Sequence, residues 1–380
     1  MALKLTPQPE TVAFIRKARQ LTSVAVADAA NMTIDLLAAV EREPTALPKG
    51  KVVALAHALA VPTQFLFFRN LRIEPNLPDF RTSGNRPAVL SSAGLARVER
   101  ARSILSYLED DIFDEDFEND LIGSVNIAGG VEAAAKVLQK YYVPVKRADG
   151  TVDPVATFRE TRVAIEKEGA IVLCEKISDD GFRGFCFSEK SHFPLILINT
   201  ASQRPATKLF TLMHEIVHVI LGRTGISDPN ILENEVERFC NKVTAAVMMP
   251  RAAFVQQYNQ VSGRSVRARA DAVAHHFGVS KSAAALRITE LGLADDFYRQ
   301  WLSALPPRIP QIEEEEEAEA SSGGGGIGAQ IGRFGYLLPS VLGKAVKKHS
   351  ISIYDAYRLT NLAPKTLTEL AQIGERKLEH

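Results

Sequence analysis

The stretch Thr211-Leu-Met-His214-Glu215-Ile-Val-His218-Val-Ile-Leu-Gly222 decides how the middle of this 380-residue chain is interpreted. Its apolar residues recur with the period of a helix and predict that one face of that helix is buried. The two histidines lie one turn apart on the same side, so they can share one metal ion. Glu215 beside them is placed to polarise a metal-bound water rather than to bind the metal. The alternative is a pair of surface or core histidines without a metal.

A catalytic zinc ion needs a third protein ligand and an open position for water. The next predicted helix, at about 234–249, offers three carboxylates near its start: Glu233, Glu235 and Glu237. Glu235 and Glu237 fall on opposite sides of the apolar stripe, so they cannot serve one site equally. We favour Glu237, because it shares a face with Asn241, whose amide could hold a ligating carboxylate or its partner histidine. Alternatively, all three are solvated first-turn acids that the helix dipole favours.

This ligand set predicts hydrolysis of a peptide bond. A Zn²⁺ ion held by His214, His218 and Glu237 would polarise the carbonyl, and Glu215 would pass the proton of water to the leaving amine. The strand 194–199 directly precedes the site helix, and a free edge there could bind substrate as an added strand. No oxyanion stabiliser stands out; Tyr258, His275 and His276 are weak candidates.

Composition restricts the class of protein. The 45 basic and 45 acidic residues balance, which argues against a dominant polyanion-binding surface, and 46% apolar residues are enough for two or three folded domains. We expect no membrane span and no secretory segment, and therefore a cytoplasmic protein. Cys174, Cys186 and Cys240 cannot form a disulfide framework and are interpreted as buried reduced thiols.

The periodicities predict an α+β, predominantly helical fold. A small sheet of about three strands, at 170–177, 182–188 and 193–199, should be antiparallel or mixed and belong to a zincin-like core. Six glutamates and a Gly-rich run between 306 and 330 cannot bury a core and predict a flexible linker. The expected domains are a five-helix helix-turn-helix domain at 1–70, a connector with helices at 71–160, the core with a helix-turn-helix-like cap at 161–305, the linker, a small basic helical module at 331–377, and a tag remnant at 378–380.

The two site motifs resemble those of the ImmA/IrrE family of metallopeptidases. The family's site helix reads much like Phe210-Thr-Leu-x-His214-Glu215-x-x-His218, although Ile216-Val217 replaces the more usual Leu-Gly. A second signature is similar to 236–250, with an acid, an Asn four residues later, small residues and a Met-Pro ending. This resemblance independently selects Glu237 as the third ligand. The connector 77–82 also looks like one found in members with an N-terminal helix-turn-helix.

The resemblance implies a bacterial or phage protein that cleaves a partner transcriptional repressor and so releases stress-response or mobile-element genes. Two alternatives remain open at this point. The chain could be one component of a toxin–antitoxin-like pair that acts through a protein complex, or a DNA-binding transcriptional regulator in which the metal is structural.

The helix-turn-helix pattern at the N-terminus does not settle DNA binding. Its predicted recognition helix, 33–42, begins with Ile34-Asp35-Leu36, where base-reading proteins place Arg, Gln, Asn, Ser or Thr. Asn31 stands where the turn needs a left-handed residue. Dimerisation or docking of a partner is therefore an equal alternative to DNA binding. A second such pattern, 270–291, has a basic flank and is either a nucleic-acid or partner contact or a helical cap on the core.

Overall fold

The computed structural model describes the chain in segments separated by gaps. The described residues are 4–19, 21–61, 63–68, 92–111, 119–177, 183–188, 193–201, 203–227, 235–261, 263–304 and 326–379. The predicted connector at 77–82 and most of the predicted linker lie outside them. Among the described residues, no single helix has the length and apolar composition to cross a bilayer. One pair of short helices, Ser23–Ala29 and Ile34–Arg42, reaches that length and composition only when taken together, and the pair is bent by 107°.

A four-stranded mixed sheet stands at the centre of the fold, in the order β3-β5-β4-β6. The strands are β3 (Ile171–Glu175), β4 (Gly184–Phe187), β5 (Leu195–Asn199) and β6 (Gly225–Ser227). β3 runs parallel to β5, whereas β4 pairs antiparallel with both β5 and β6. The three predicted strands are present, and β6 adds a fourth. The α+β, predominantly helical class is therefore confirmed.

The strands β3, β4 and β5 divide their side chains between two separate cores. Ile171, Leu173 and Leu197 belong to one apolar cluster, and the alternating residues Val172 and Ile196 belong to the other. This alternation follows from the pleat, which points successive side chains to opposite faces. Both faces are covered, which explains why the strands read as nearly continuous apolar runs.

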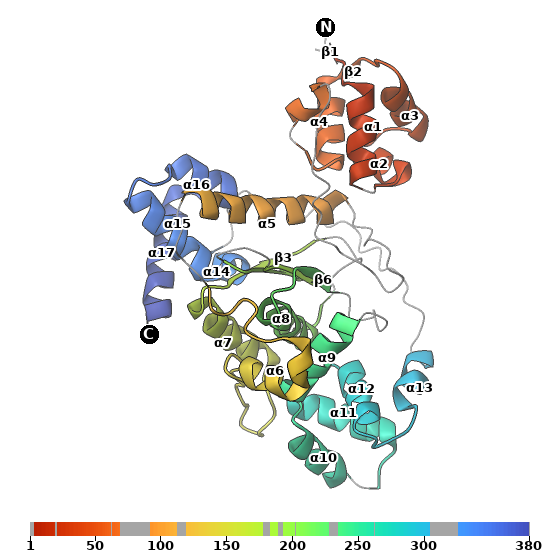
Figure 1. Cartoon of the computed structure of the whole chain (residues 1–380), viewed down its shortest axis with the longest axis vertical. Helices are drawn as coiled ribbons and strands as arrows, with labels where there is room; N and C mark the ends of the chain where they lie inside the picture. Colours follow the sequence, from red (N-terminus) through yellow and green to blue (C-terminus); the bar gives the residue numbers. More distant parts are fainter. Residues whose placement is uncertain are drawn as a thin grey trace.

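The first face of the sheet, called the metal face below, is covered by α8 (Pro205–Ile220) together with α6 (Gly130–Gln139), α7 (Pro154–Lys167) and α9 (Glu235–Met248). α8 begins with Pro205 in its first turn and ends before Gly222. The φ of Gly222, +63°, lies in the left-handed region that favours glycine. Figure 1 shows α8 directly below the sheet with α6 and α9 outside it.

The second face, called the cover face, is closed by segments remote in sequence. α5 (Ser92–Asp111) crosses this side of the sheet, and α14 (Ile327–Phe334) and α15 (Leu337–Lys347) pack against β3 (Figure 1). α16 (Ile353–Thr360) and α17 (Pro364–Glu379) complete the C-terminal module. Because α14 begins at Ile327, the predicted linker boundary at residue 330 is wrong. Apolar residues on α14, among them Phe334, pack against the sheet and make the segment helical.

Buried charges fasten this cover to the core. Arg162 of α7 donates to the backbone carbonyls of Ile331 and Gly332 at 3.2 and 2.7 Å, and it pairs with Glu166 at 3.1 Å. Glu166 in turn accepts the backbone N–H of Tyr336. The C-terminal module is thus attached through main-chain groups that only a buried guanidinium and carboxylate satisfy.

Glu175 at the end of β3 is a second fastening point. Its carboxylate, almost fully buried, lies 3.0 Å from Arg97 and 2.9 Å from Arg100 of α5, and 3.4 Å from Arg333 of α14. One carboxylate therefore joins the sheet to α5 and α14, and three guanidiniums depend on it for charge balance.

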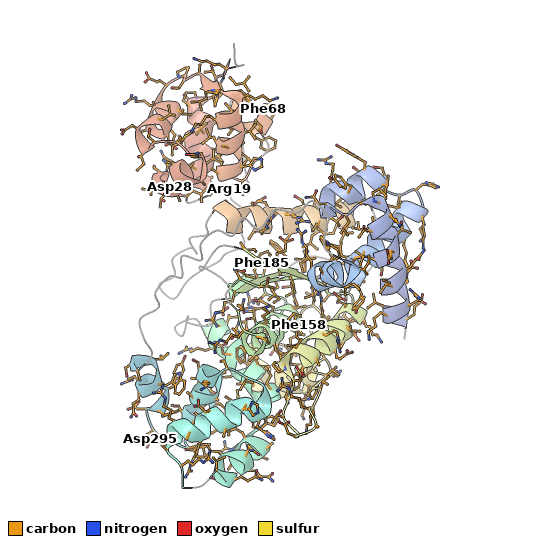
Figure 2. The ribbon with its side chains drawn as sticks, turned by 180° about the vertical axis from the view of Figure 1, so that it is seen from behind. Arg19, Asp28, Phe68, Phe158, Phe185 and Asp295 are labelled. Atoms are coloured by element: carbon orange, nitrogen blue, oxygen red, sulfur yellow. The ribbon has the colours of Figure 1, made fainter. Side chains whose placement is uncertain are left out.

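The N-terminal segment, where a helix-turn-helix is predicted, is mainly helical. Its elements are β1 (Lys4–Leu5), α1 (Pro9–Ala18), α2 (Ser23–Ala29), α3 (Ile34–Arg42), β2 (Leu47–Pro48), α4 (Lys49–Ala58) and a 3₁₀ helix, Thr63–Phe67. Asn31 between α2 and α3 has φ +49°, as its place in the turn predicts. Arg19, labelled in Figure 2 at the edge of the domain nearest α5, pairs with Glu99 of α5 at 2.7 Å.

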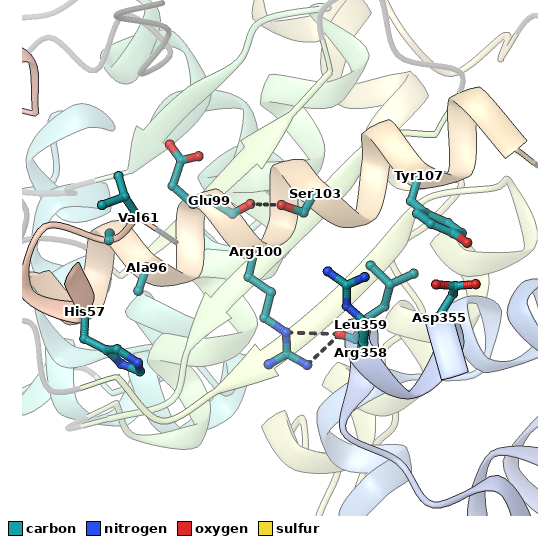
Figure 3. Close-up of a pocket in the computed structure, with 11 residues that line it drawn as sticks. His57, Val61, Ala96, Glu99, Arg100, Ser103, Tyr107, Asp355, Arg358 and Leu359 are labelled. Carbon is teal, nitrogen blue, oxygen red and sulfur yellow. Dashed lines mark hydrogen bonds between the residues drawn. The ribbon is translucent and has the colours of Figure 1, made fainter. Parts of the chain in front are cut away.

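A cavity of about 490 Å³ lies where the N-terminal domain, α5 and α16 meet. Figure 3 shows its lining: His57 and Val61 come from the N-terminal domain, and Arg358 comes from α16. On its wall the Arg100 guanidinium donates to the carbonyl oxygen of Leu359 at 2.9 and 3.2 Å. This cavity contains none of the predicted site residues.

The predicted cap forms a helical unit beyond α9. It consists of α10 (Arg251–Gln260), α11 (Val266–Phe277), α12 (Lys281–Glu290) and α13 (Phe297–Ser303). Several cations of its basic flank are engaged inside the unit: Arg267 lies over Trp301, Arg269 lies over Tyr258, and Lys281 pairs with Asp271. These contacts favour the interpretation as a cap on the core.

Candidate metal centre

Helix α8 presents both motif histidines toward the interior. His214 and His218 are each 2% exposed and Glu215 is fully buried, on a helix whose other residues from Leu209 to Ile220 are almost all buried as well. A charged or polar triplet at such depth is costly unless its groups find partners or bind a metal ion.

Three ligand-type side chains converge at one point of this interior. The Nε2 atoms of His214 and His218 lie 3.1 Å apart. The Glu237 carboxylate reaches both rings, with Oε2 3.1 Å from Nε2 of His214 and Oε1 3.0 Å from Nε2 of His218. Ligands of a tetrahedral zinc ion at about 2.0–2.1 Å are separated from one another by roughly 3.3 Å. The three atoms therefore have nearly the spacing that one small divalent ion imposes.

Glu237 is brought here by the first turn of α9, and its competitors are not. Glu235, two residues earlier, is exposed on the other side of the helix, as the sequence pattern predicts, and Glu233 lies outside the described residues. Asn241 is buried one turn after Glu237, but within the described residues its Oδ1 has no hydrogen-bond partner. The role of Asn241 in holding a ligand stays a prediction.

The site is electrostatically prepared for a cation. Burial alone would raise the pKa of the Glu237 carboxyl, yet His218 and His214 hold it well below its ordinary value. Burial alone would lower the pKa of His218, yet Cys240 and Glu237 raise it well above its ordinary value. His218 and the Glu237 carboxylate therefore favour each other's charged forms.

Glu215 lies against the backbone of β4. A Cβ atom added to Gly184 would stand 2.8 Å from Oε1 of Glu215 and 2.9 Å from Cγ2 of Thr211, so a larger residue would displace them. Sequence reasoning missed Gly184, because its importance depends on how closely β4 approaches α8. Glycine at this position allows the carboxylate to lie between the helix and the sheet.

Cys240 is the second residue whose place at the site sequence reasoning missed, because it was interpreted only as a buried reduced thiol. Its thiol is fully buried, and the ligand atoms of His214, His218 and Cys240 all lie within 4.8 Å of one another. Burial raises the pKa of this thiol, and His218 opposes that rise. The spacing of three residues after Glu237, which places both on one helical face, is a signal that could have identified it.

The remaining predicted site features lie elsewhere. Tyr258 and His276 are in the α10–α12 unit, where they contact Arg269 and Phe277, and His275 is exposed. None of these contacts involves a metal-site residue. The expectation of a free edge at 194–199 is wrong, because β5 is hydrogen-bonded on both sides, to β3 and to β4. Hydrophobicity places this strand at the centre, because both of its faces are buried.

The donor set fits a metal ion. Two imidazoles and a carboxylate suit zinc and related divalent ions. Both Nε2 atoms point at the same position, and neither Nδ1 atom has a hydrogen-bond partner among the described residues. Two ring nitrogens that face each other at 3.1 Å are stable only with a shared proton or a shared cation. A buried HExxH helix with a carboxylate from the next helix defines a metallopeptidase-type site.

Comparison with known proteins agrees with this class. Residues 165–289 match the family described as the IrrE N-terminal-like domain. The chain is also similar to the radiation response metalloprotease IrrE of Deinococcus radiodurans, at 31% identity over 140 residues, which cover 34% of this chain and 40% of that protein. This chain thus matches about two fifths of the relative's length. No solved structure matches the chain.

The matched segment runs from the end of α7 into α12 and includes the sheet and both site helices. This part of the chain is similar to the IrrE N-terminal-like family, and the similarity supports a metallopeptidase.

Proposed function

We propose that this protein is a zinc-dependent endopeptidase that cleaves a partner transcriptional repressor or regulator. The observation that carries the proposal is the meeting of His214, His218 and the Glu237 carboxylate at 3.0–3.1 Å, beside buried Glu215. His214, His218 and Glu237 would hold the ion. When bound, a zinc ion would lower the pKa of water and polarise the scissile carbonyl.

Glu215 acts as the general base of this proposal. Glu215 directly follows His214, and its carboxylate lies close against the backbone at Gly184. It accepts the proton of the attacking water and returns it to the leaving amine. Burial of the whole group excludes bulk water, which strengthens each electrostatic contact within it.

An extended peptide can add to the sheet at β6. Within the described residues β6 pairs only with β4, so one edge of β6 remains available for main-chain hydrogen bonds. β6 also packs against α8, which carries both histidines. Binding by strand addition would hold the substrate backbone extended along the site helix.

The N-terminal domain supports a protein rather than a DNA partner. Ile34 at the start of the recognition helix is 48% exposed, and Asp35 beside it is exposed as well. An apolar and an acidic residue at this position suit docking of a protein surface and repel phosphates. We therefore assign this domain to recognition of the substrate protein or to dimerisation.

The test compares two conservative variants of neighbouring site helices. Glu215→Gln should retain zinc, measured by elemental analysis, and abolish cleavage of the protein encoded by the adjacent regulator gene. Glu235→Gln removes an exposed carboxylate and should leave both properties unchanged. Unchanged cleavage by Glu215→Gln would refute the mechanism.

The two alternative functions give different results in the same assays. A DNA-binding regulator with a structural metal would retain specific DNA in salt and be insensitive to Glu215→Gln. A toxin–antitoxin component would form a stable complex with its neighbour-encoded partner and suppress toxicity without peptidase activity.

A further inference from the structure

We infer that Cys240 is a fourth protein ligand of the metal ion and closes the resting site against water. The inference rests on the proposed metal site, and it adds a residue that the peptidase mechanism does not use. Catalytic zinc sites keep one position open, whereas sites with four protein ligands, thiolates among them, are closed.

The position of Cys240 supports ligation more than simple core packing. It follows Glu237 by three residues on α9, so both side chains leave the same face of the helix, toward His214 and His218. Its ligand atom lies within 4.8 Å of those of both histidines, whereas the ordinary surroundings of a buried thiol are apolar. Two imidazoles, one carboxylate and one thiol together make up the four donors of a tetrahedral ion.

Burial of the site agrees with a closed state. His214, His218, Glu237 and Cys240 are all at most 5% exposed, with Glu215 fully buried between them and β4. A thiolate binds zinc strongly, because it is a soft ligand. It would occupy the position that the reaction needs for water, so the peptidase is latent until Cys240 leaves the ion.

The chain supplies a matched control in Cys186. This thiol is equally buried in the same core, but its Sγ lies 3.4 Å from the carbonyl oxygen of Arg223 and not at the histidines. Cys186→Ala therefore removes a buried thiol of the metal-face core without removing a donor.

The experiment titrates the metal-free full-length protein with Co²⁺ and records its absorption spectrum. We expect one Co²⁺ per chain, with a near-ultraviolet thiolate-to-cobalt charge-transfer band in the wild type and in Cys186→Ala. Cys240→Ala should still bind one Co²⁺ but lose that band, and it should release zinc to a chelator about tenfold faster or more. Its peptidase activity should rise.

Each other result is decisive. Binding of Co²⁺ without the band in the wild type, or a band that survives in Cys240→Ala, overturns the inference and leaves the proposed peptidase site intact. Loss of all binding in Cys240→Ala would make the thiol an essential third ligand and overturn the closing role. Failure of the wild type to bind any metal would refute the proposed function itself.

Discussion

The two faces of the central sheet are built from different kinds of sequence. The metal face is covered by helices close to the strands along the chain, and the family match at 165–289 contains the two that carry the site, α8 and α9. The cover face is closed by α5, which precedes the sheet, and by α14 and α15, which follow it by more than a hundred residues. The same strands serve both cores, since alternate residues point to each.

This difference separates chemistry from stability. The metal face contains the buried donors, whereas the buried charges that hold the cover face in place lie at its contacts with the rest of the fold. Arg162 and Glu166 reach from α7 to the C-terminal module, and Glu175 joins β3 to α5 and α14. Substitutions on the metal face should therefore change metal binding or activity and leave stability unchanged. Substitutions on the cover face should change stability and leave metal binding unchanged. The following predictions test that separation, from the largest expected effect to the smallest.

His218→Ala should abolish stoichiometric metal binding. The variant removes one of the two imidazole donors and leaves two facing side chains without a shared ion. Elemental analysis after purification in zinc should fall from one ion per chain to near zero, with helical content by circular dichroism retained. Retention of a full equivalent of zinc would place the metal elsewhere.

Glu175→Gln should lower the free energy of unfolding by about 3 kcal/mol, because three arginines lose their shared carboxylate in a largely buried place. Urea denaturation measures this loss, and zinc content should stay at one ion per chain. Glu160→Gln, which removes a partly exposed partner of Arg159 at 3.1 Å and of Lys377 at 3.8 Å, is the matched control and should change stability by less than about 0.5 kcal/mol. A loss of metal in Glu175→Gln would contradict the separation of the two faces.

Gly184→Ala should lower kcat about 100-fold while zinc remains bound, because a Cβ at 2.8 Å from Oε1 of Glu215 forces the carboxylate to move. The substituted strand keeps its hydrogen bonds, so the fold should persist. Kinetics on the cleaved regulator, with zinc measured in parallel, test this expectation. An unchanged kcat would show that Glu215 does not need this close contact.

The metal-free protein should show a pH-dependent contribution from the His218–Glu237 pair. The raised pKa of His218 stabilises the fold fully below its ordinary value of 6.5 and less as the pH rises through the raised value. The lowered pKa of Glu237 stabilises it above 4.5 and less as the pH falls through the lowered value. The difference in Tm between metal-free wild type and Glu237→Gln should be greatest at pH 4.5–6.5 and shrink toward pH 9.

Zinc affinity should increase as the pH rises above 6, because the ion competes with the proton on His218. Competition titrations with a chelator at several pH values measure it. A pair contribution that grows with pH would contradict the assigned directions of both pKa shifts.

Much of the fold was predictable where local pattern decides. Helix α8 forms over the stretch whose apolar period predicts a helix with one buried face, and the three strands lie where their apolar runs predict them. The left-handed Asn31 also followed from its turn. These features depend on side chains a few residues apart, so one sequence contains the necessary information.

Predictions that required distant neighbours were weaker. The strand at 194–199 is central and not an edge, because β3 and β4 pair with it from both sides. The basic excess of 331–377 left its partner open, and the structure shows this module packed on the sheet. Charge and periodicity give no information on which remote segment covers a given face.

The sequence by itself determined the site helix, its two histidines and glutamate, and the side of α9 that supplies a carboxylate, because helical periodicity sets which side chains share a face. Only the tertiary structure decided that Gly184 lies against Glu215, that Cys240 reaches the histidines, and that one buried carboxylate, Glu175, joins α5, β3 and α14. Those contacts depend on the packing of elements far apart in the chain, and close packing is a property of the folded whole.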